Sequence, residues 1–398
     1  MLASPAAVRE VFTGDPELLR AGEANSLLQA ALGRSSLLLL DGEQHLRERR
    51  LMLPPFHGER MRAYGSLIAA LAEREIGGWP SGTGFEVGSR FRRVALDVIV
   101  QAVFGVEEQD RIERLADALR RFLDTVTSPF RMLVLLSIKP DGLTVRAWQR
   151  HAPSIRRVDA LIYDEIQRRR ADPRTPERED ILSMLIPSMS DEQLRNELMT
   201  LLLAGHETSA AGLAWAVERL ARHPGVLDRL SAEASGDADE YLDAVVKETL
   251  RVRPVLPAVF RALAAPVEIA GRELPANAWV APCVHLVHRN PELYPEPDAF
   301  RPERFLEAQA DTYGWIPFGG GTRRCLGGAF AMFEMKTVLR ELVRLGSFGP
   351  ADADDEGVRR RGVVLVPGAG ARIVWRAGYD AAGAASGAAG TRVGGASR

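Results

Sequence analysis

Near its C-terminal end the chain presents one cysteine in a setting that favours the thiolate. The surrounding segment, 318–328, reads Phe-Gly-Gly-Gly-Thr-Arg-Arg-Cys-Leu-Gly-Gly. Its glycines allow the backbone to approach a flat ligand closely. The apolar pattern that follows predicts that the last helix begins around Cys325, and a helix N-terminus favours a thiolate over a thiol. Arg323 can pair with an acidic group on the same ligand. The alternative is a buried structural cysteine after a flexible loop.

A second candidate group is an alcohol next to a carboxylate. The segment Ala-Gly-His-Glu-Thr-Ser, 204–209, lies inside the longest uninterrupted helical pattern of the chain, 194–222. A threonine hydroxyl in mid-helix can interrupt the helical bonding and hold a water, and a hydroxyl can relay protons from a carboxylate. Thr208 and Glu207 are therefore candidates for proton transfer. Alternatively, both residues lie on a solvated helix face.

Charged residues at helical spacing form two further groups. His45 and Arg49 are four residues apart, so they share a helix face and can bind an acidic group together. Glu248 and Arg251 are three residues apart and can form an ion pair. Each pattern taken alone also fits an ordinary solvated helix.

A zinc site is a competing interpretation of another segment. Cys283, His285 and His288 have a spacing that could hold zinc. However, alternate residues of a strand point to opposite faces, which disfavours a shared metal. Cys283 is therefore predicted to be a core residue of a strand.

The elements that must position these groups are mostly helical. Between about 43 and 250, apolar residues recur at three- and four-residue intervals, which is typical of amphipathic helices. After Pro254, short apolar runs separated by turn residues predict hairpins and short strands, and the proline-rich stretch 294–305 predicts an irregular loop. The expected fold class is mainly α with small β-sheets (α+β). Residues 1–376 are predicted to form a single domain and 377–398, which are rich in glycine and alanine, a disordered tail.

Composition excludes several classes of function. The 398 residues carry a net charge of -2, so no global basic field favours nucleic acid. No apolar window approaches the length needed to cross a bilayer, and the start has no export signal, so we expect no membrane partner. The chain has two cysteines, which fits a reducing compartment and predicts a cytoplasmic protein.

Five residues of the cysteine loop carry a resemblance to a known family. Phe318, Gly321, Arg323, Cys325 and Gly327 match the haem-binding loop F-x-x-G-x-R-x-C-x-G of the cytochrome P-450 family. The match constrains five positions in one short segment, so it is specific.

Other motifs of that family occur along the chain in the expected order. Residues 204–208 resemble its oxygen-binding A-G-x-[DE]-T segment, 248–251 its E-x-x-R helix, and 45–49 its H-x-x-x-R pair. The resemblance runs from about residue 3 to residue 375. It begins late, because relatives have an N-terminal helix and a first pair of strands before the segment that corresponds to 4–12. Without these elements we expect a sheet edge to be uncovered.

The resemblance implies the cytochrome P-450 fold, with a long central helix over a haem b and the cysteine loop before the last helix. The resemblance implies that Cys325 is the iron ligand and that Gly205 leaves room for dioxygen. It also implies that Thr208 and Glu207 are the alcohol and the acid of proton delivery. The other expected site residues are the haem-carboxylate ligands His45, Arg49, Arg261 and Arg323, the loop residue Phe318, and the structural ion-pair network of Glu248, Arg251 and Arg304.

The resemblance also implies an activity. A haem-thiolate monooxygenase inserts one atom of O2 into a small hydrophobic substrate, by hydroxylation or epoxidation. No flavin or iron–sulfur segment is visible, so electrons are expected from a ferredoxin or flavodoxin with its reductase, docked on the cysteine side near Arg324. Two alternatives remain: a peroxide-driven hydroxylase, which would not need Thr208, and a non-catalytic haem-binding sensor.

Overall fold

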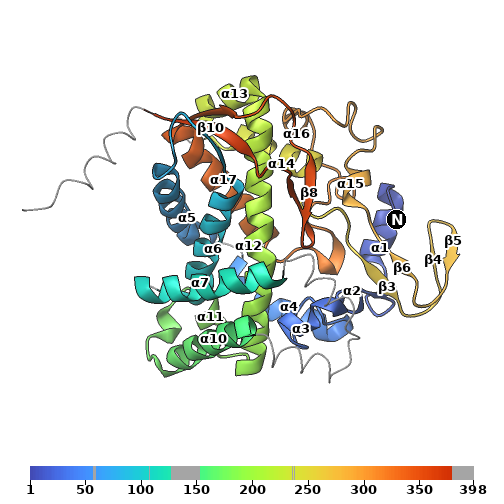
Figure 1. The fold of residues 1–398 in the computed structure, drawn as a ribbon. Helices are drawn as coiled ribbons and strands as arrows, with labels where there is room; N and C mark the ends of the chain where they lie inside the picture. The colour runs from blue at the N-terminus through green and yellow to red at the C-terminus, as the bar shows by residue number, and fades with distance from the viewer. Residues whose placement is uncertain (57–59, 107, 127–152, 235, 237, 379–398) are drawn as a thin grey trace, which may run out of the picture.

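One long helix organises the molecule. The computed structural model describes the chain except residues 57–59, 107, 127–152, 235, 237 and 379–398. Helix α12, Asp191–Arg222, passes through the centre, and other elements surround it on all sides (Figure 1). A capping box starts it: the Ser190 hydroxyl accepts from the backbone of Gln193, whose side chain accepts from the backbone of Ser190. The helix ends before Pro224, which cannot continue it. It therefore begins three residues earlier than predicted and ends where predicted.

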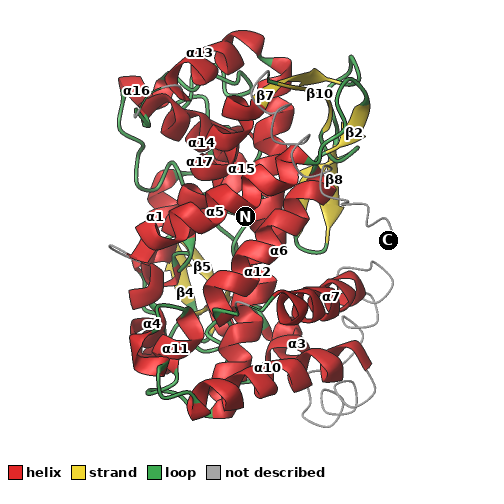
Figure 2. Cartoon of the chain, turned by 90° about the vertical axis from the view of Figure 1, so that its left-hand side faces the viewer, coloured by secondary structure: helices red, strands yellow, loops and turns green. Residues whose placement is uncertain are grey.

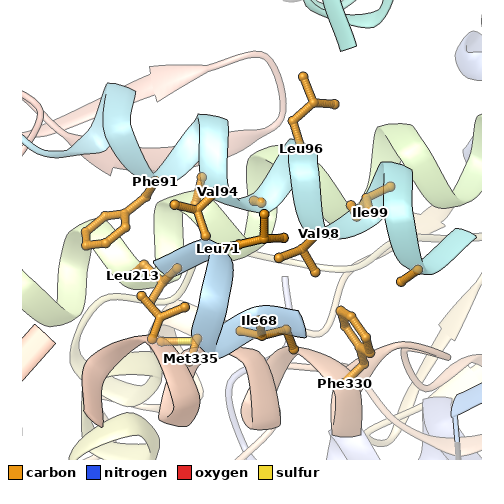
Figure 3. Packing of buried hydrophobic residues seen from close by; sticks show 14 of the residues in the cluster. Ile68, Leu71, Phe91, Val94, Leu96, Val98, Ile99, Leu213, Phe330 and Met335 are labelled. Atoms are coloured by element: carbon orange, nitrogen blue, oxygen red, sulfur yellow. The ribbon is translucent and has the colours of Figure 1, made fainter. Parts of the chain in front are cut away.

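Helices from both halves of the chain pack around α12. Side chains of α5 (Arg60–Gly77), α6 (Gly88–Phe104) and α17 (Gly328–Leu345) meet α12 in one apolar cluster (Figure 3). The packing joins Ile68, Phe91, Leu213 and Met335, which come from four different helices. The remaining long helices are α7 (Gln109–Val126), α10 (Pro153–Ala171), α13 (Pro224–Ala234) and α14 (Glu240–Val252), with the short α11 (Ile181–Leu185) beside α6.

The N-terminal part is a series of shorter helices. It comprises α1 (Pro5–Thr13), α2 (Ala21–Ala24), α3 (Gln29–Leu32) and α4 (Gly42–Met52). The Ser4 hydroxyl caps α1 by accepting from the backbone of Ala7. Helix α1 lies against the cysteine loop, so the two ends of the domain meet.

Four small sheets lie at the edges of the helical body (Figure 2). Strands β1 (Leu19–Arg20) and β6 (Trp279–Val280) both pair antiparallel with β3 (Arg261–Leu263). Beside β6, Leu2 forms an isolated parallel bridge with Pro282, and Trp279 is 55% exposed. The other pairings are β2 (Gly84–Glu86) and β7 (Gly346–Pro350) on β10 (Arg372–Ala377), β4 (Val267–Ile269) on β5 (Arg272–Leu274), and β8 (Val358–Arg361) on β9 (Val364–Pro367).

The predicted class, mainly α with small sheets, is confirmed, and several local predictions need correction. The last helix begins at Gly328, because a 3-10 turn, Gly321–Arg323, and a further turn carry the chain past Cys325 first. Cys283 is a buried core residue but lies in no strand; it precedes the short helix α15, Val284–Val287. The stretch 294–305 is irregular until α16, Arg304–Glu307.

The C-terminal boundary lies slightly later than the sequence suggests. Ala377 pairs with Gly346 at the end of β10, and the backbone N–H of Gly378 donates to the carbonyl of Leu345. The rest of the predicted 377–398 tail lies outside the described residues. Among the residues that the structure describes, none of the helices has the length and hydropathy of a membrane span.

Candidate functional site

The cysteine loop is held by its own backbone and by α1. The amide of Cys325 donates to the carbonyl of Phe318 at 2.8 Å, which closes the loop. Gly321 has a φ of 62°, and a β-carbon there would overlap the carbonyl oxygen of Phe12; one at Gly320 would overlap the Phe12 ring. Glycine is therefore required at these positions by the close approach of α1, a reason that differs from the approach to a flat ligand expected from the sequence.

Cys325 sits deep in the protein and yet its side chain is accessible. Burial raises the pKa of the Cys325 thiol, whereas the Gly327 amide and the charges of Arg49 and Arg324 act in the opposite direction. The sequence predicted a favoured thiolate, but desolvation is the larger effect here. A bound metal cation would overcome it, because a coordinated thiol loses its proton outright.

Helix α12 also has one accessible residue, as the cysteine loop does at Cys325. Ala204 is exposed, although the flanking residues of α12 are largely buried. Thr208 lies one turn further on the same face, and its hydroxyl donates to the carbonyl of Ala204 at 2.5 Å. Accessible positions at Ala204 on α12 and at Cys325 in the cysteine loop are compatible with a flat cofactor between these two elements.

Gly205 has a packing role in the structure. A β-carbon at this position would lie 2.5 Å from Cδ1 of Ile99 on α6. The direction of its missing side chain is thus taken by α6, which packs closely along α12. That Gly205 leaves room for dioxygen stays a prediction.

Four basic residues predicted as haem-carboxylate ligands come together from three segments. Burial and the charges of Arg323, Arg49 and Arg261 lower the pKa of His45 to about 3. Burial also lowers the pKa of Arg261 to about 10, helped by Arg323 and opposed by Asp41. We call His45, Arg49, Arg261 and Arg323 the basic cluster. His45 is therefore neutral near pH 7, and the mutual repulsion of the three arginines fits a site for an anionic ligand.

Asp41 is the acidic member that sequence reasoning missed. Its carboxylate pairs with Arg323, with Nη2 and Oδ1 2.5 Å apart, and accepts from the backbone amides of Gly22 and Glu23. The Arg323 guanidinium also donates to the carbonyls of Leu37 and Leu40. One carboxylate does not balance the charges of three arginines, so the cluster retains capacity for further carboxylates.

Glu207 and Thr208 are neighbours in sequence but point in different directions. Oε2 of Glu207 lies 3.1 Å from Nε of Arg361 on β8, and the Glu207 side chain is buried. Thr208 instead shares the accessible face of Ala204. The structure therefore places both predicted residues on one helical turn without a direct contact between their side chains among the described hydrogen bonds.

A further acidic residue, Glu334, lies close to the helical turn of Glu207 and Thr208 and was not predicted from the sequence. Glu334 of α17 is fully buried, and burial raises its pKa to about 7, while the Ser209 hydroxyl of α12 acts in the opposite direction. The sequence held a signal, because Glu334 stands four residues after Phe330 and four before Val338 on the apolar stripe of the helix.

The predicted ion-pair network is present and buried. Nε of Arg251 lies 2.6 Å from Oε2 of Glu248, and Nε of Arg304 lies 3.1 Å from Oε1 of the same carboxylate. The Arg251 guanidinium also donates to the carbonyls of His288, Pro297 and Ala299. The network thus ties α14 to the irregular stretch before α16.

The alternative zinc site has no support. The thiol of Cys283 faces the carbonyl of Pro257 at 3.5 Å, and Nε2 of His288 accepts from the amide of Ile316 at 2.8 Å. His285 lies against Arg289. No group of three or more His, Cys, Asp or Glu in the described part of the chain could hold a metal ion.

The fold and this arrangement define a class, the haem-thiolate proteins with a long helix above the cysteine loop. Residues 1–369 match the family model for cytochrome P450, and the chain belongs to that family. As its family predicts, it is a monooxygenase of the oxidoreductase class.

Named relatives agree with this assignment. The chain is 44% identical to a protein of Mycobacterium tuberculosis named putative cytochrome P450 135B1, over 95% of this chain and 82% of the other. It is 37% identical to putative cytochrome P450 137 of the same organism, over 94% of this chain and 80% of that protein.

Solved structures share the fold. The retinoic acid-bound cyanobacterial CYP120A1 matches with a TM-score of 0.78 at 24% identity and covers 93% of this chain and 87% of its own. The haem domain of cytochrome P450DA matches with the same TM-score at 23% identity, over 94% of this chain and 86% of its own.

Proposed function

We propose that this monooxygenase holds a haem b through Cys325 and inserts one atom of O2 into a small hydrophobic substrate, with electrons from a separate ferredoxin or flavodoxin and its reductase. The basic cluster beside the accessible thiol is the observation that carries this proposal. The cluster supplies positive charge for the two carboxylates of a haem, and Cys325 beside it supplies the sulfur ligand. The family assignment supplies the reaction class.

The residues divide the work between binding and proton handling. Bound haem supplies the oxygen activation itself. Cys325 ligates the iron, and the basic cluster holds the cofactor's carboxylates. The Thr208 hydroxyl, on the accessible face of α12, holds a proton or a water close to the substrate. Glu207, whose side chain points away from Thr208, is the acid of proton delivery. Phe318 closes the cysteine loop through its carbonyl.

Ligation is tested by a reduced carbon monoxide difference spectrum. The purified protein is expected to give the spectrum of a sulfur-ligated haem, and Cys325→Ser is expected to lose it. Cys283→Ser is the matched control, because that thiol is buried against a carbonyl far from the basic cluster in sequence. An unaltered spectrum in Cys325→Ser contradicts the proposal.

Turnover separates the proposed electron source from its alternatives. Product formation with ferredoxin and reductase, and its loss in Thr208→Ala, is expected for the monooxygenase with proton relay. Activity with peroxide alone, unaffected by Thr208→Ala, would favour the peroxide-driven hydroxylase. No substrate-dependent NAD(P)H consumption with several redox partners would favour the sensor.

The docking surface is tested by charge reversal. Arg324 is exposed next to Cys325, so Arg324→Glu is expected to slow reduction by an acidic ferredoxin, most strongly at low ionic strength. Arg157→Glu on α10 is the control, because it changes the net charge equally at another exposed site. Equal rates for both variants and the unaltered protein across ionic strengths would argue against docking at Arg324.

A further inference from the structure

His206 is a buried residue that the proposed function leaves without a role. It lies on α12 directly before Glu207 and is 3% exposed. Its Nε2 lies 2.9 Å from the backbone carbonyl of Arg92 on α6. A carbonyl oxygen only accepts, so Nε2 must carry a proton. In the neutral imidazole Nδ1 is then a bare acceptor.

The bare Nδ1 faces a second acceptor. It lies 3.6 Å from Oε1 of Glu207. Both atoms are buried, and neither has a hydrogen-bond partner among the residues that the structure describes. Two buried lone pairs in this position are costly. The separation is too long for a hydrogen bond and shorter than the roughly 4.5 Å that a bridging water needs. A proton between the two atoms, with a closure of about half an ångström, removes the conflict.

We infer that His206 and Glu207 together hold one exchangeable proton, and that His206 is a positioning residue for proton delivery through Glu207. The inference rests on the proposed role of Glu207 and Thr208. The carboxylate is fixed on its other side by Arg361, which lies 3.1 Å from Oε2. The shared proton thus lies at a defined atom, Oε1, one residue from Thr208.

Burial and neighbouring positive charges lower the affinity of His206 for the shared proton. Burial and the charges of Arg92, Arg361 and Arg120, which belong to α6, β8 and α7, lower the pKa of His206 to about 4, while the bond to the Arg92 carbonyl acts in the opposite direction. Such an imidazole does not keep a second proton for itself near neutral pH. Its Nδ1 can therefore share a proton with Oε1 of Glu207 and release that proton readily.

A small cavity beside the Glu207 carboxylate offers a source for replacing the shared proton. A cavity of about 10 Å³ beside Glu207 is also lined by Arg92, Glu86 and Arg359. This volume holds about one water molecule, and four charged side chains among otherwise apolar walls offer it hydrogen-bond partners. Arg359 is exposed, so the cavity lies close to solvent. A proton that leaves Glu207 is replaced by one from this water, which regains a proton from solvent, and no electron moves in the exchange.

Nitrogen NMR tests the shared proton without any turnover. The protein holds seven histidines, and 15N-histidine labelling of the haem-loaded, carbon monoxide-bound enzyme gives their tautomers; loss of a signal in His206→Gln assigns His206. We expect a protonated Nε2 and an Nδ1 resonance between the bare and protonated positions, which moves toward the bare position in Glu207→Gln. Glu86→Gln, which removes the other carboxylate of the cavity, should leave it in place. A protonated Nδ1 with bare Nε2, or no response to Glu207→Gln, overturns the inference.

Turnover tests its consequence. The side-chain amide introduced by His206→Gln can keep the donor to the Arg92 carbonyl but cannot titrate. We therefore expect about a ten-fold fall in product per NAD(P)H, with more hydrogen peroxide released and a flattened pH profile. His206→Asn, whose amide lies nearer the Nδ1 position, should recover part of the coupling. Unchanged coupling and pH dependence in His206→Gln overturn the inference.

The two proposals fail in different ways. A retained carbon monoxide spectrum and product formation with unchanged coupling in His206→Gln would leave the monooxygenase proposal intact and remove the role of His206. A protein that takes up haem but forms no product with any partner would contradict the proposed function, while the NMR experiment would still decide whether the pair shares a proton.

Discussion

Arg361 of β8 holds one carboxylate oxygen of Glu207 on α12, with Nε and Oε2 3.1 Å apart. The pair joins the C-terminal hairpin β8–β9 to the middle of the central helix. The Glu207 side chain is buried, so the charge of Arg361 is felt in surroundings where screening is weak. The hairpin therefore helps to determine where the predicted acid points.

Removing this arginine should disturb proton delivery. In Arg361→Gln the buried carboxylate loses a charged partner, and we expect product per NAD(P)H to fall about five-fold while the carbon monoxide spectrum is kept. Hydrogen peroxide release measures the loss. Arg360→Gln is the control, because Arg360 is exposed and alternates to the other face of the strand. Equal coupling in both variants would separate Arg361 from proton delivery.

The basic cluster predicts opposite effects on the empty and the loaded protein. Burial and neighbouring charge lower the pKa of Arg261 to about 10, so below that pH its charge destabilises the folded protein without haem. Arg261→Met should therefore raise the free energy of unfolding of the haem-free protein at pH 7, by about 3 kcal/mol. The same change removes a charge-assisted bond to the cofactor, so haem should dissociate about ten-fold faster.

Both effects of Arg261→Met are measured on one preparation, by urea unfolding before haem is added and by haem transfer to an acceptor afterwards. Arg272→Met on the exposed β5 strand serves as the control and should change neither quantity. A haem-free protein that loses stability in Arg261→Met would show that Arg261 is held by favourable contacts and not strained by repulsion.

Much of the fold could be predicted from the sequence because apolar residues recur regularly at helical spacing. The stretch that became α12 has a capping residue at one end and a proline after the other, so both ends are locally specified. The start of α17 was placed too early, since Cys325, Gly327 and Gly328 carry no apolar signal that separates a turn from a first helical turn. Cys283 was assigned to a strand because four residues of α15 are too few to show a helical period.

The site divides in the same way. The Glu248–Arg251 pair could be predicted because its two residues are three positions apart, and Cys325 could be proposed because its motif lies in one short segment. The contacts of Arg361 with Glu207, and of Asp41 with Arg323, join segments far apart in the chain, and no local pattern reports them. Phe12 explains two loop glycines only once α1 is seen to lie against them.

The ion-pair network should be among the least tolerant features of the fold. Glu248 and Arg251 are fully buried, so Glu248→Gln leaves the charges of Arg251 and Arg304 without their carboxylate. A loss of about 3–5 kcal/mol in the free energy of unfolding is expected, enough to lower the yield of folded protein. Asp164→Asn removes an exposed pair with Arg168 and should cost less than about 1 kcal/mol. Similar urea midpoints for the two variants would contradict a stabilising role for the network.

Glu334 predicts a specific dependence of stability on pH. Burial raises its pKa to about 7 from an ordinary value near 4.5, so the folded protein prefers the protonated form. The cost of ionising it is absent below about pH 4.5, grows as the pH rises, and is complete above pH 7, where it amounts to about 3 kcal/mol. Glu334→Gln cannot ionise, so its stability relative to the unaltered protein should improve by about this amount between pH 5 and pH 8, whatever constant cost the amide adds.

Urea unfolding of the haem-loaded protein at several pH values measures the difference, with Glu341→Gln, on a less buried position of α17, as the control. If the two stability curves run parallel across this range, Glu334 either finds a proton donor on folding or is reached by water, and it is then not the buried neutral acid that its position beside Ser209 indicates.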